Sequence, residues 1–94
     1  AGRLDFDAPD LEKFPCLKLA FEAGKQGGTL PVVMNAANEE AVYLFLDQKI
    51  SLWQIYEITK KMMDSHTNIL NPSLEQILET DMIIRDFVKK STAY

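Results

Sequence analysis

Apolar residues recur at spacings of three and four along most of the chain, which is the repeat of an amphipathic α-helix. The clearest repeat occupies five positions: Leu30, Met34, Ala37, Ala41 and Leu44. This spacing predicts a helix that begins near residues 29–31 and runs to about Asp47. Its alanines leave room for neighbouring helix backbones, so we expect it to be the central helix.

A shorter helix should precede the central one. Pro15 suits a first helical position, because the N–H group that proline lacks has no partner in the first turn. The apolar stripe of this helix should be buried and comprises Leu17, Ala20, Phe21 and Gly24. The segment GKQGGT, residues 24–29, should end the helix in a tight turn.

A third helix is indicated by Ser51, which Gln54 follows three residues later, the spacing of a capping box. Ile50 is placed to meet Ile55 across its first turn. The expected inner stripe of this helix is Leu52, Ile55, Tyr56, Thr59, Met62 and Met63.

The last helix should begin within NPSLEQ, residues 71–76, with Asn71 or Ser73 as its cap. Its first inward side chains should be Leu74, Ile77 and Leu78. The same stripe then meets Asp81 and Arg85, so the hydrophobic register shifts. We therefore expect a kink or a short break between Glu79 and Asp81.

These elements predict an all-α fold, with a small four-helix bundle over residues 14–94. Residues 1–13 should form an extended linker arm, in which Leu4 and Phe6 alternate with polar residues before Pro9. The apolar side chains of the arm are suited to lie along another surface. A chain of 94 residues is one domain at most.

Composition excludes several classes of function. The net charge of -4 provides no basic field for a phosphate backbone, so we expect no nucleic-acid partner. The longest apolar run, residues 30–34, is far shorter than the about 20 residues of a membrane-spanning helix, so we expect no membrane partner either. A single cysteine, Cys16, favours a reducing compartment such as the cytosol or an organelle stroma.

The segment DSHTNILNPSLE, residues 64–75, outlines a calcium-binding loop between two helices. Ile69 and Pro72 oppose this interpretation, because they occupy the glycine position and a ligand position of such a loop. Asp64, Ser65 and His66 have the residue types of a hydrolase triad, but adjacent residues cannot easily face one another as nucleophile, base and orienting group. We expect a capped loop with a solvent-facing histidine, and we assign no catalytic, cofactor-binding or metal-binding residue.

Two asparagines interrupt the apolar central helix. Asn35, Asn38 and Glu39 share one side of it, and a buried amide without a partner costs about 1–3 kcal/mol. Either these side chains face solvent, or they tie the helix to a loop or another domain. The second reading is favoured, because the helix is otherwise so apolar.

Three segments of the chain are distinctive: FPCLKLAFEAGKQGGTLPVVMNAANEEAV (residues 14–42), LDFDAPDLEKFPCLKLA (residues 4–20) and SLEQILETD (residues 73–81). Together they resemble the carboxy-terminal domain of 1-deoxy-D-xylulose 5-phosphate reductoisomerases. The order FPCLKLA, GGT, NAANEEAV is specific to this family, while the match after Lys49 is looser.

The resemblance implies an NADPH-dependent enzyme of non-mevalonate isoprenoid biosynthesis, assisted by Mg²⁺ or Mn²⁺, that forms 2-C-methyl-D-erythritol 4-phosphate. It implies a homodimer in the bacterial cytosol or a plastid-type organelle. NADPH, metal and substrate would be bound by upstream domains, so the 94-residue chain alone should be inactive.

The expected partners are the catalytic and NADPH-binding domains of the same polypeptide. Structural contacts with them are expected from six residues: Asn35, Asn38, Glu39, Leu4, Phe6 and Pro9. The alternatives are a free-standing helical interaction module and a small calcium-binding protein.

Overall fold

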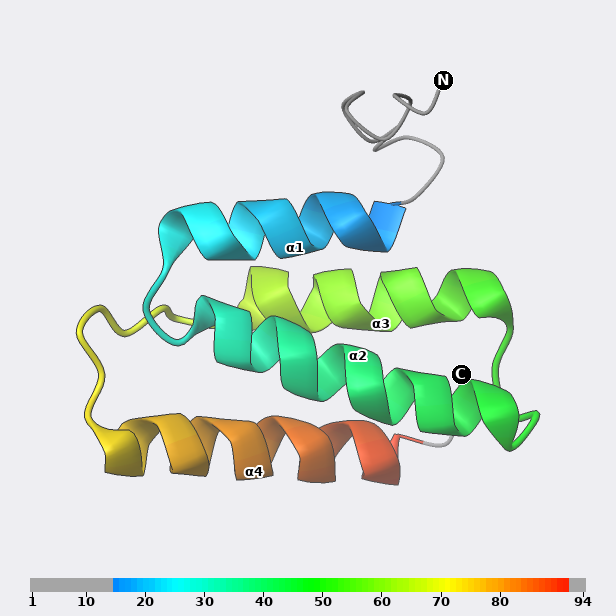
Figure 1. Ribbon diagram of the computed structural model, residues 1–94. Helices are drawn as coiled ribbons and strands as arrows, with labels where there is room; N and C mark the ends of the chain where they lie inside the picture. Colours follow the sequence, from blue (N-terminus) through cyan, green and yellow to red (C-terminus); the bar gives the residue numbers. More distant parts are fainter. Residues whose placement is uncertain (1–14, 92–94) are drawn as a thin grey trace, which may run out of the picture.

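Four α-helices make up most of residues 15–91, the part of the chain that the computed structural model describes (Figure 1). They are α1 (Pro15–Gln26), α2 (Leu30–Leu46), α3 (Leu52–Ser65) and α4 (Leu74–Lys90). This part of the chain contains no strand. The predicted all-α fold is therefore confirmed.

Reciprocal side-chain caps determine where α3 and α4 begin. The backbone N–H of Gln54 donates to Ser51 Oγ over 3.3 Å, and the N–H of Ser51 donates to Gln54 Oε1 over 2.7 Å. Ser73 and Gln76 form the same pair of bonds at the start of α4. Each capping box satisfies two N–H groups that the helix itself leaves unpaired. Of the two predicted caps for α4, Ser73 is the one used.

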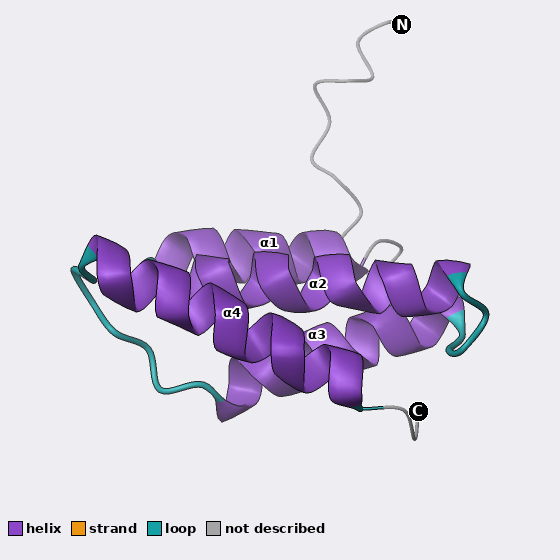
Figure 2. Ribbon diagram, turned by 90° about the horizontal axis from the view of Figure 1, so that it is seen from below, coloured by secondary structure: helices purple, strands orange, loops and turns teal. Residues whose placement is uncertain are grey.

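The central position of α2 is confirmed. It packs against α1, α3 and α4, whereas α4 makes its main contacts with α2. Figures 1 and 2 show α1 and α4 on opposite sides of α2, with α2 and α4 running in the same direction. The principal dimensions are 44, 36 and 18 Å, so the assembly is flat and leaves broad helix surfaces uncovered.

The hydrophobic core lies mainly where α2 meets α3. Its buried side chains are Leu19, Ala23, Leu30, Val33, Ala37, Ala41, Leu44, Ile50, Ile55, Ile58, Met62, Met63 and Val88. Ala37 and Ala41 are fully buried, and their small size permits the close approach of a neighbouring helix. Val88 is the sole buried residue of α4.

Most of the apolar stripe predicted to be buried on α1 is exposed instead, and Ala20 is its one half-buried member. Leu17 and Phe21 leave 37% and 53% of their surface open to solvent, and Gly24 is also exposed. The buried residues of α1 are Leu19 and Ala23. This helix carries two apolar surfaces, and the described chain covers only one of them.

The inner stripes predicted for α3 and α4 need a similar correction. Leu52, Leu74 and Leu78 are exposed, while Ile58 and Val88 are buried. The remaining predicted core positions of α3 are buried or half-buried. The sequence contains more apolar residues than these four helices cover, so periodicity alone did not identify which residues this chain buries.

The break expected between Glu79 and Asp81 is absent, because α4 is one continuous helix. The polar side chains in its inner stripe have partners that explain this continuity. The Nε group of Arg85 donates to both carboxylate oxygens of Asp81, one turn away on the same helix. Such a pair supports helical geometry instead of interrupting it.

Candidate functional site: a docking face on α2 and α4

The three polar residues singled out on α2 have different surroundings. Asn38 is half-buried, and its Nδ2 group donates to Cys16 Sγ of α1 over 3.8 Å. Burial raises the pKa of the Cys16 thiol, and the bond from Asn38 opposes that rise. Glu39 accepts a bond from α4, and Asn35 is exposed. Two of these residues therefore link α2 to neighbouring helices, while Asn35 presents its amide at the surface.

Arg85 binds three carboxylates, two of which lie on α2 and one on α4 itself. Its Nη1 group donates to Glu39 Oε1 over 2.6 Å and to Glu40 Oε2 over 3.1 Å, and its Nε group donates to Asp81 over 3.0 and 3.1 Å. The bonds to Asp81, then Glu39, then Glu40 raise the pKa of Arg85. One guanidinium faces three carboxylates, so these four residues, the Arg85 cluster, have a formal charge of -2.

The carboxylate of Glu40 is the buried member of the Arg85 cluster, with only 6% of its side chain exposed. A buried carboxylate requires a charged or hydrogen-bonding partner, and Arg85 supplies it. This contact was not predicted from the sequence. The spacing of Asp81 and Arg85 along α4 signals an ion pair within one helix, but the pairing with Glu40 depends on how α4 lies on α2.

A groove of about 380 Å³ lies between the amino-terminal halves of α2 and α4. It is lined by Pro31, Val32, Asn35, Ile77, Leu78 and Asp81. Four of these residues are apolar, so Asn35 and Asp81 bring the polar groups to the groove. The predicted docking residue Asn35 thus lies opposite a carboxylate of the Arg85 cluster.

Exposed apolar side chains continue from this groove along α4. Leu74, Leu78 and Met82 follow one another at intervals of four, so they lie on one flank of the helix, and each is more than half exposed. We call these three residues the α4 stripe. A large exposed apolar surface on a soluble domain marks an interaction site more often than a single exposed residue does.

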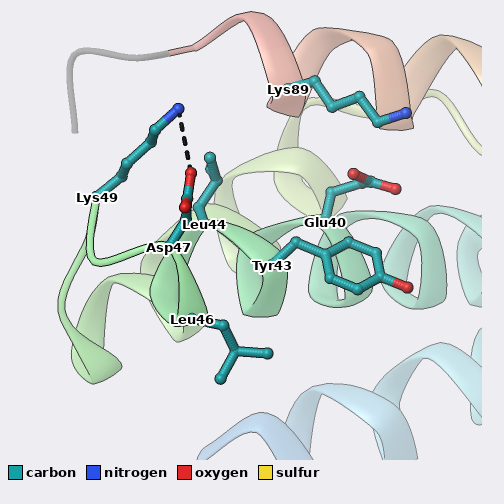
Figure 3. A pocket seen from close by; sticks show the side chains of 7 residues that line it. All are labelled: Glu40, Tyr43, Leu44, Leu46, Asp47, Lys49 and Lys89. Atoms are coloured by element: carbon teal, nitrogen blue, oxygen red, sulfur yellow. Dashed lines mark ion pairs between the residues drawn. The ribbon is translucent and has the colours of Figure 1, made fainter.

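A second hollow, of about 500 Å³, lies between the carboxy-terminal ends of α2 and α4 (Figure 3). Lys49 and Asp47 form an ion pair of 3.4 Å at one end, and Glu40 and Lys89 lie at the other. Both carboxylates already have basic partners, since Arg85 binds Glu40. The two carboxylates that line the hollow are therefore both members of ion pairs.

The loop between α3 and α4 is fixed to the turn before α2. The hydroxyl of Thr29, which is fully buried, lies 2.7 Å from His66 Nε2 and accepts the N–H of Ile69 over 3.0 Å. Asn68 Oδ1 accepts the N–H of Leu30, and Asn68 Nδ2 donates to the carbonyl of Gly27. His66 is therefore half-buried and hydrogen-bonded, not solvent-facing as predicted.

The three triad-like residues engage separate partners. Asp64 pairs with Lys60, the Ser65 hydroxyl donates to a helix carbonyl, and His66 contacts Thr29. Burial lowers the pKa of His66. Their side chains do not meet as nucleophile, base and orienting group.

Within residues 15–91, no three metal-ligating side chains come together. None of the helices in this range is both long and apolar enough to cross a membrane. Leu4, Phe6 and Pro9, which were predicted to be docking residues, lie outside the described residues, as does the predicted boundary after residue 13.

Comparison with known proteins gives a consistent result. The 1-deoxy-D-xylulose 5-phosphate reductoisomerase of Acetivibrio thermocellus is 51% identical over 95% of this chain and 23% of its own length. The enzyme of Halothermothrix orenii is 48% identical over 97% of this chain and 24% of its own length. The enzyme of Thermodesulfovibrio yellowstonii is 48% identical over 94% of this chain and 23% of its own length. The chain thus spans about a quarter of the length of these relatives. No solved structure matches it.

The sequence profile described as the DXP reductoisomerase C-terminal domain matches residues 1–87, which is most of the chain. Together with the relatives, this match confirms the resemblance carried by the three segments quoted above. The chain belongs to the DXP reductoisomerase C-terminal domain family.

Proposed function

We propose that this chain is the helical domain of an enzyme that converts 1-deoxy-D-xylulose 5-phosphate to 2-C-methyl-D-erythritol 4-phosphate. Its role there is to brace the catalytic and NADPH-binding domains of the same polypeptide. The observation that carries this proposal is the match of nearly the whole chain to one quarter of such enzymes. The exposed face of α2 and α4, where Asn35 lies beside apolar side chains, suits a docking surface of this kind.

The chemistry is assigned to the other three-quarters of the enzyme. Residues 15–91 do not bring together a ligand set for Mg²⁺ or Mn²⁺, and they contain no strand followed by a glycine-rich turn that would receive a dinucleotide. We therefore assign no step of the reaction to a residue of this chain. Asn35, Asn38 and Glu39 are proposed to act by positioning the domain.

The test is a chimera in which this chain replaces the matching segment of the Acetivibrio thermocellus reductoisomerase. Oxidation of NADPH in the presence of 1-deoxy-D-xylulose 5-phosphate reports activity. We expect an active chimera, and no activity from the 94-residue chain alone. A chimera that is folded by circular dichroism but does not turn over would overturn the proposal.

The docking residues are tested in the same chimera. Asn35→Leu with Asn38→Leu should lower its melting temperature or its turnover. The matched control is Glu57→Leu with Lys61→Leu, which changes two exposed residues of α3. If the two double variants have the same melting temperature and turnover as the unmodified chimera, the asparagines have no docking role.

A further inference from the structure

The groove between α2 and α4 combines apolar walls with a negatively charged edge. Pro31 and Val32 line one side of it, and Ile77 and Leu78 line the other. Asp81 contributes a carboxylate to the same groove, with 36% of its side chain exposed. A long side chain with an apolar stem and a cationic end would contact both parts.

The charge of the Arg85 cluster favours such an occupant. Arg85 is shared by Asp81, Glu39 and Glu40, so its single positive charge leaves two negative charges without balance. The carboxylates of Asp81 and Glu39 are the exposed members of the cluster. Each carboxylate oxygen accepts more than one hydrogen bond, so Asp81 retains capacity for a donor that enters the groove.

The surroundings of the groove favour a protein surface over a free small cation. The α4 stripe extends from the groove along one flank of α4 and is more than half exposed. On α1, Cys16 contacts Asn38 of α2, and the exposed Leu17 and Phe21 lie further around the helix from Leu19 and Ala23. Exposed apolar surface beside the groove suits a protein partner better than a free cation.

We infer that the groove receives a lysine or arginine side chain from another domain of the same polypeptide, with apolar residues of that domain packed on the α4 stripe. This inference rests on the proposed function, which supplies the covalently linked partner. The inference also specifies the chemistry of the contact. The apolar stem of the basic side chain lies between Val32 and Leu78, and its cationic end lies at Asp81. Arginine and lysine both pack their stems on apolar surface in this way.

The first experiment places a photoreactive benzoylphenylalanine at Leu78 of the chimera described above. After irradiation, mass spectrometry identifies the cross-linked peptide. The expected product is intramolecular and joins Leu78 to a segment outside this chain that contains a lysine or arginine. Trp53 carries the photoreactive residue in the control, because it lines a different hollow on α3, and it should not reach that segment.

The second experiment exchanges the charges. Asp81→Lys should lower the intramolecular cross-linking yield about fivefold, as expected from replacing attraction by repulsion at a partly exposed contact. Changing the identified basic residue to glutamate should do the same, and combining both changes should restore at least half of the yield. Asp86→Lys is the matched control, because it makes the same charge reversal at the carboxylate of another i,i+4 pair on α4, that with Lys90.

The outcomes separate this inference from the proposed function. A cross-link to a segment that lacks lysine and arginine, a cross-link only between two copies, or no restoration in the charge exchange overturns the inference even if the chimera is active. An inactive chimera without any intramolecular cross-link overturns the proposed function as well. A cross-link beside a basic residue, together with restoration by the charge exchange, supports both.

Discussion

Replacing Arg85 with methionine should destabilise the chain more than the loss of any other ion pair within residues 15–91. Methionine keeps an apolar stem in place but leaves Glu40 with its charge and only 6% of its side chain exposed. Removing one partner of a fully buried pair costs about 3–5 kcal/mol, because the other charge is left uncompensated. Arg85 itself is 23% exposed, so water would reach part of the vacated space and reduce this contribution to about 2–3 kcal/mol.

The loss of the ion pairs with Glu39 and Asp81 adds less to the cost of Arg85→Met. Glu39 and Asp81 expose 47% and 36% of their side chains, so water replaces much of what Arg85 provides, and each pair contributes about 0.3–0.5 kcal/mol. The expected total for Arg85→Met is therefore about 2.5–4 kcal/mol. In a domain of this size, that corresponds to a fall in melting temperature of at least about 10 °C.

Urea denaturation near neutral pH, followed by circular dichroism, measures this change. Lys90→Met is the control, because it removes an exposed pair on the same helix, and it should cost less than about 0.5 kcal/mol. Adding Glu40→Gln to Arg85→Met should recover part of the loss, since the buried charge is then gone. Equal costs for Arg85→Met and Lys90→Met, or a further loss in the double variant, would refute the reasoning.

Three other predictions concern the turn before α2 and the loop that it holds. Gly28→Ala should lower the free energy of unfolding, measured in urea, by at least about 1 kcal/mol more than Gly27→Ala does. Both glycines have φ near +67°, so the backbone strain is the same. A Cβ at Gly28 would lie 2.5 Å from a loop carbonyl oxygen, whereas Gly27 faces open space. Equal midpoints would disprove the close approach. Thr29→Val should cost about 1–3 kcal/mol, because its buried hydroxyl accepts a loop N–H, and exposed Thr67→Val less than about 0.5 kcal/mol. A tolerated Thr29→Val would show that the hydroxyl is dispensable. Burial lowers the pKa of His66 in the folded chain, so this histidine binds a proton more readily in the unfolded chain. The free energy of unfolding should therefore fall as the pH drops below about 6.5, the ordinary pKa of histidine. His66→Gln should flatten that part of a stability–pH curve, and an unchanged slope would contradict the assignment.

The helices were predictable because their signals are local. Ser51 and Ser73 begin helices through bonds to residues three positions later, and the turn before α2 is marked by consecutive glycines. The order of the four helices and the central place of α2 followed from these signals and from the alanines of α2. Caps and turns of this kind can be recognised without knowing the tertiary contacts between helices.

The buried faces and the site were less predictable, for a physical reason. Leu17 and Phe21 have the spacing of a core stripe, but periodicity says that a stripe is apolar and not which surface covers it. The contact of Arg85 with Glu39 and Glu40 joins residues 46 and 45 positions apart, so it depends on the packing of two helices. Asn35 and Asn38 were singled out because amides are unusual in so apolar a helix, and their docking role stays a prediction.

Because α4 packs mainly on α2, its stability depends on few contacts within the bundle. Only Val88 of α4 is buried, so opening this helix should require less free energy than opening α2 or α3. A partner surface that binds only the bundle with α4 packed on α2 stabilises that packed state. The stabilisation grows with the logarithm of the concentration of the partner surface. A domain tethered in the same polypeptide presents such a surface at a high effective concentration. The last helix would then owe part of its stability to a surface outside the bundle, and folding and docking would be one coupled equilibrium.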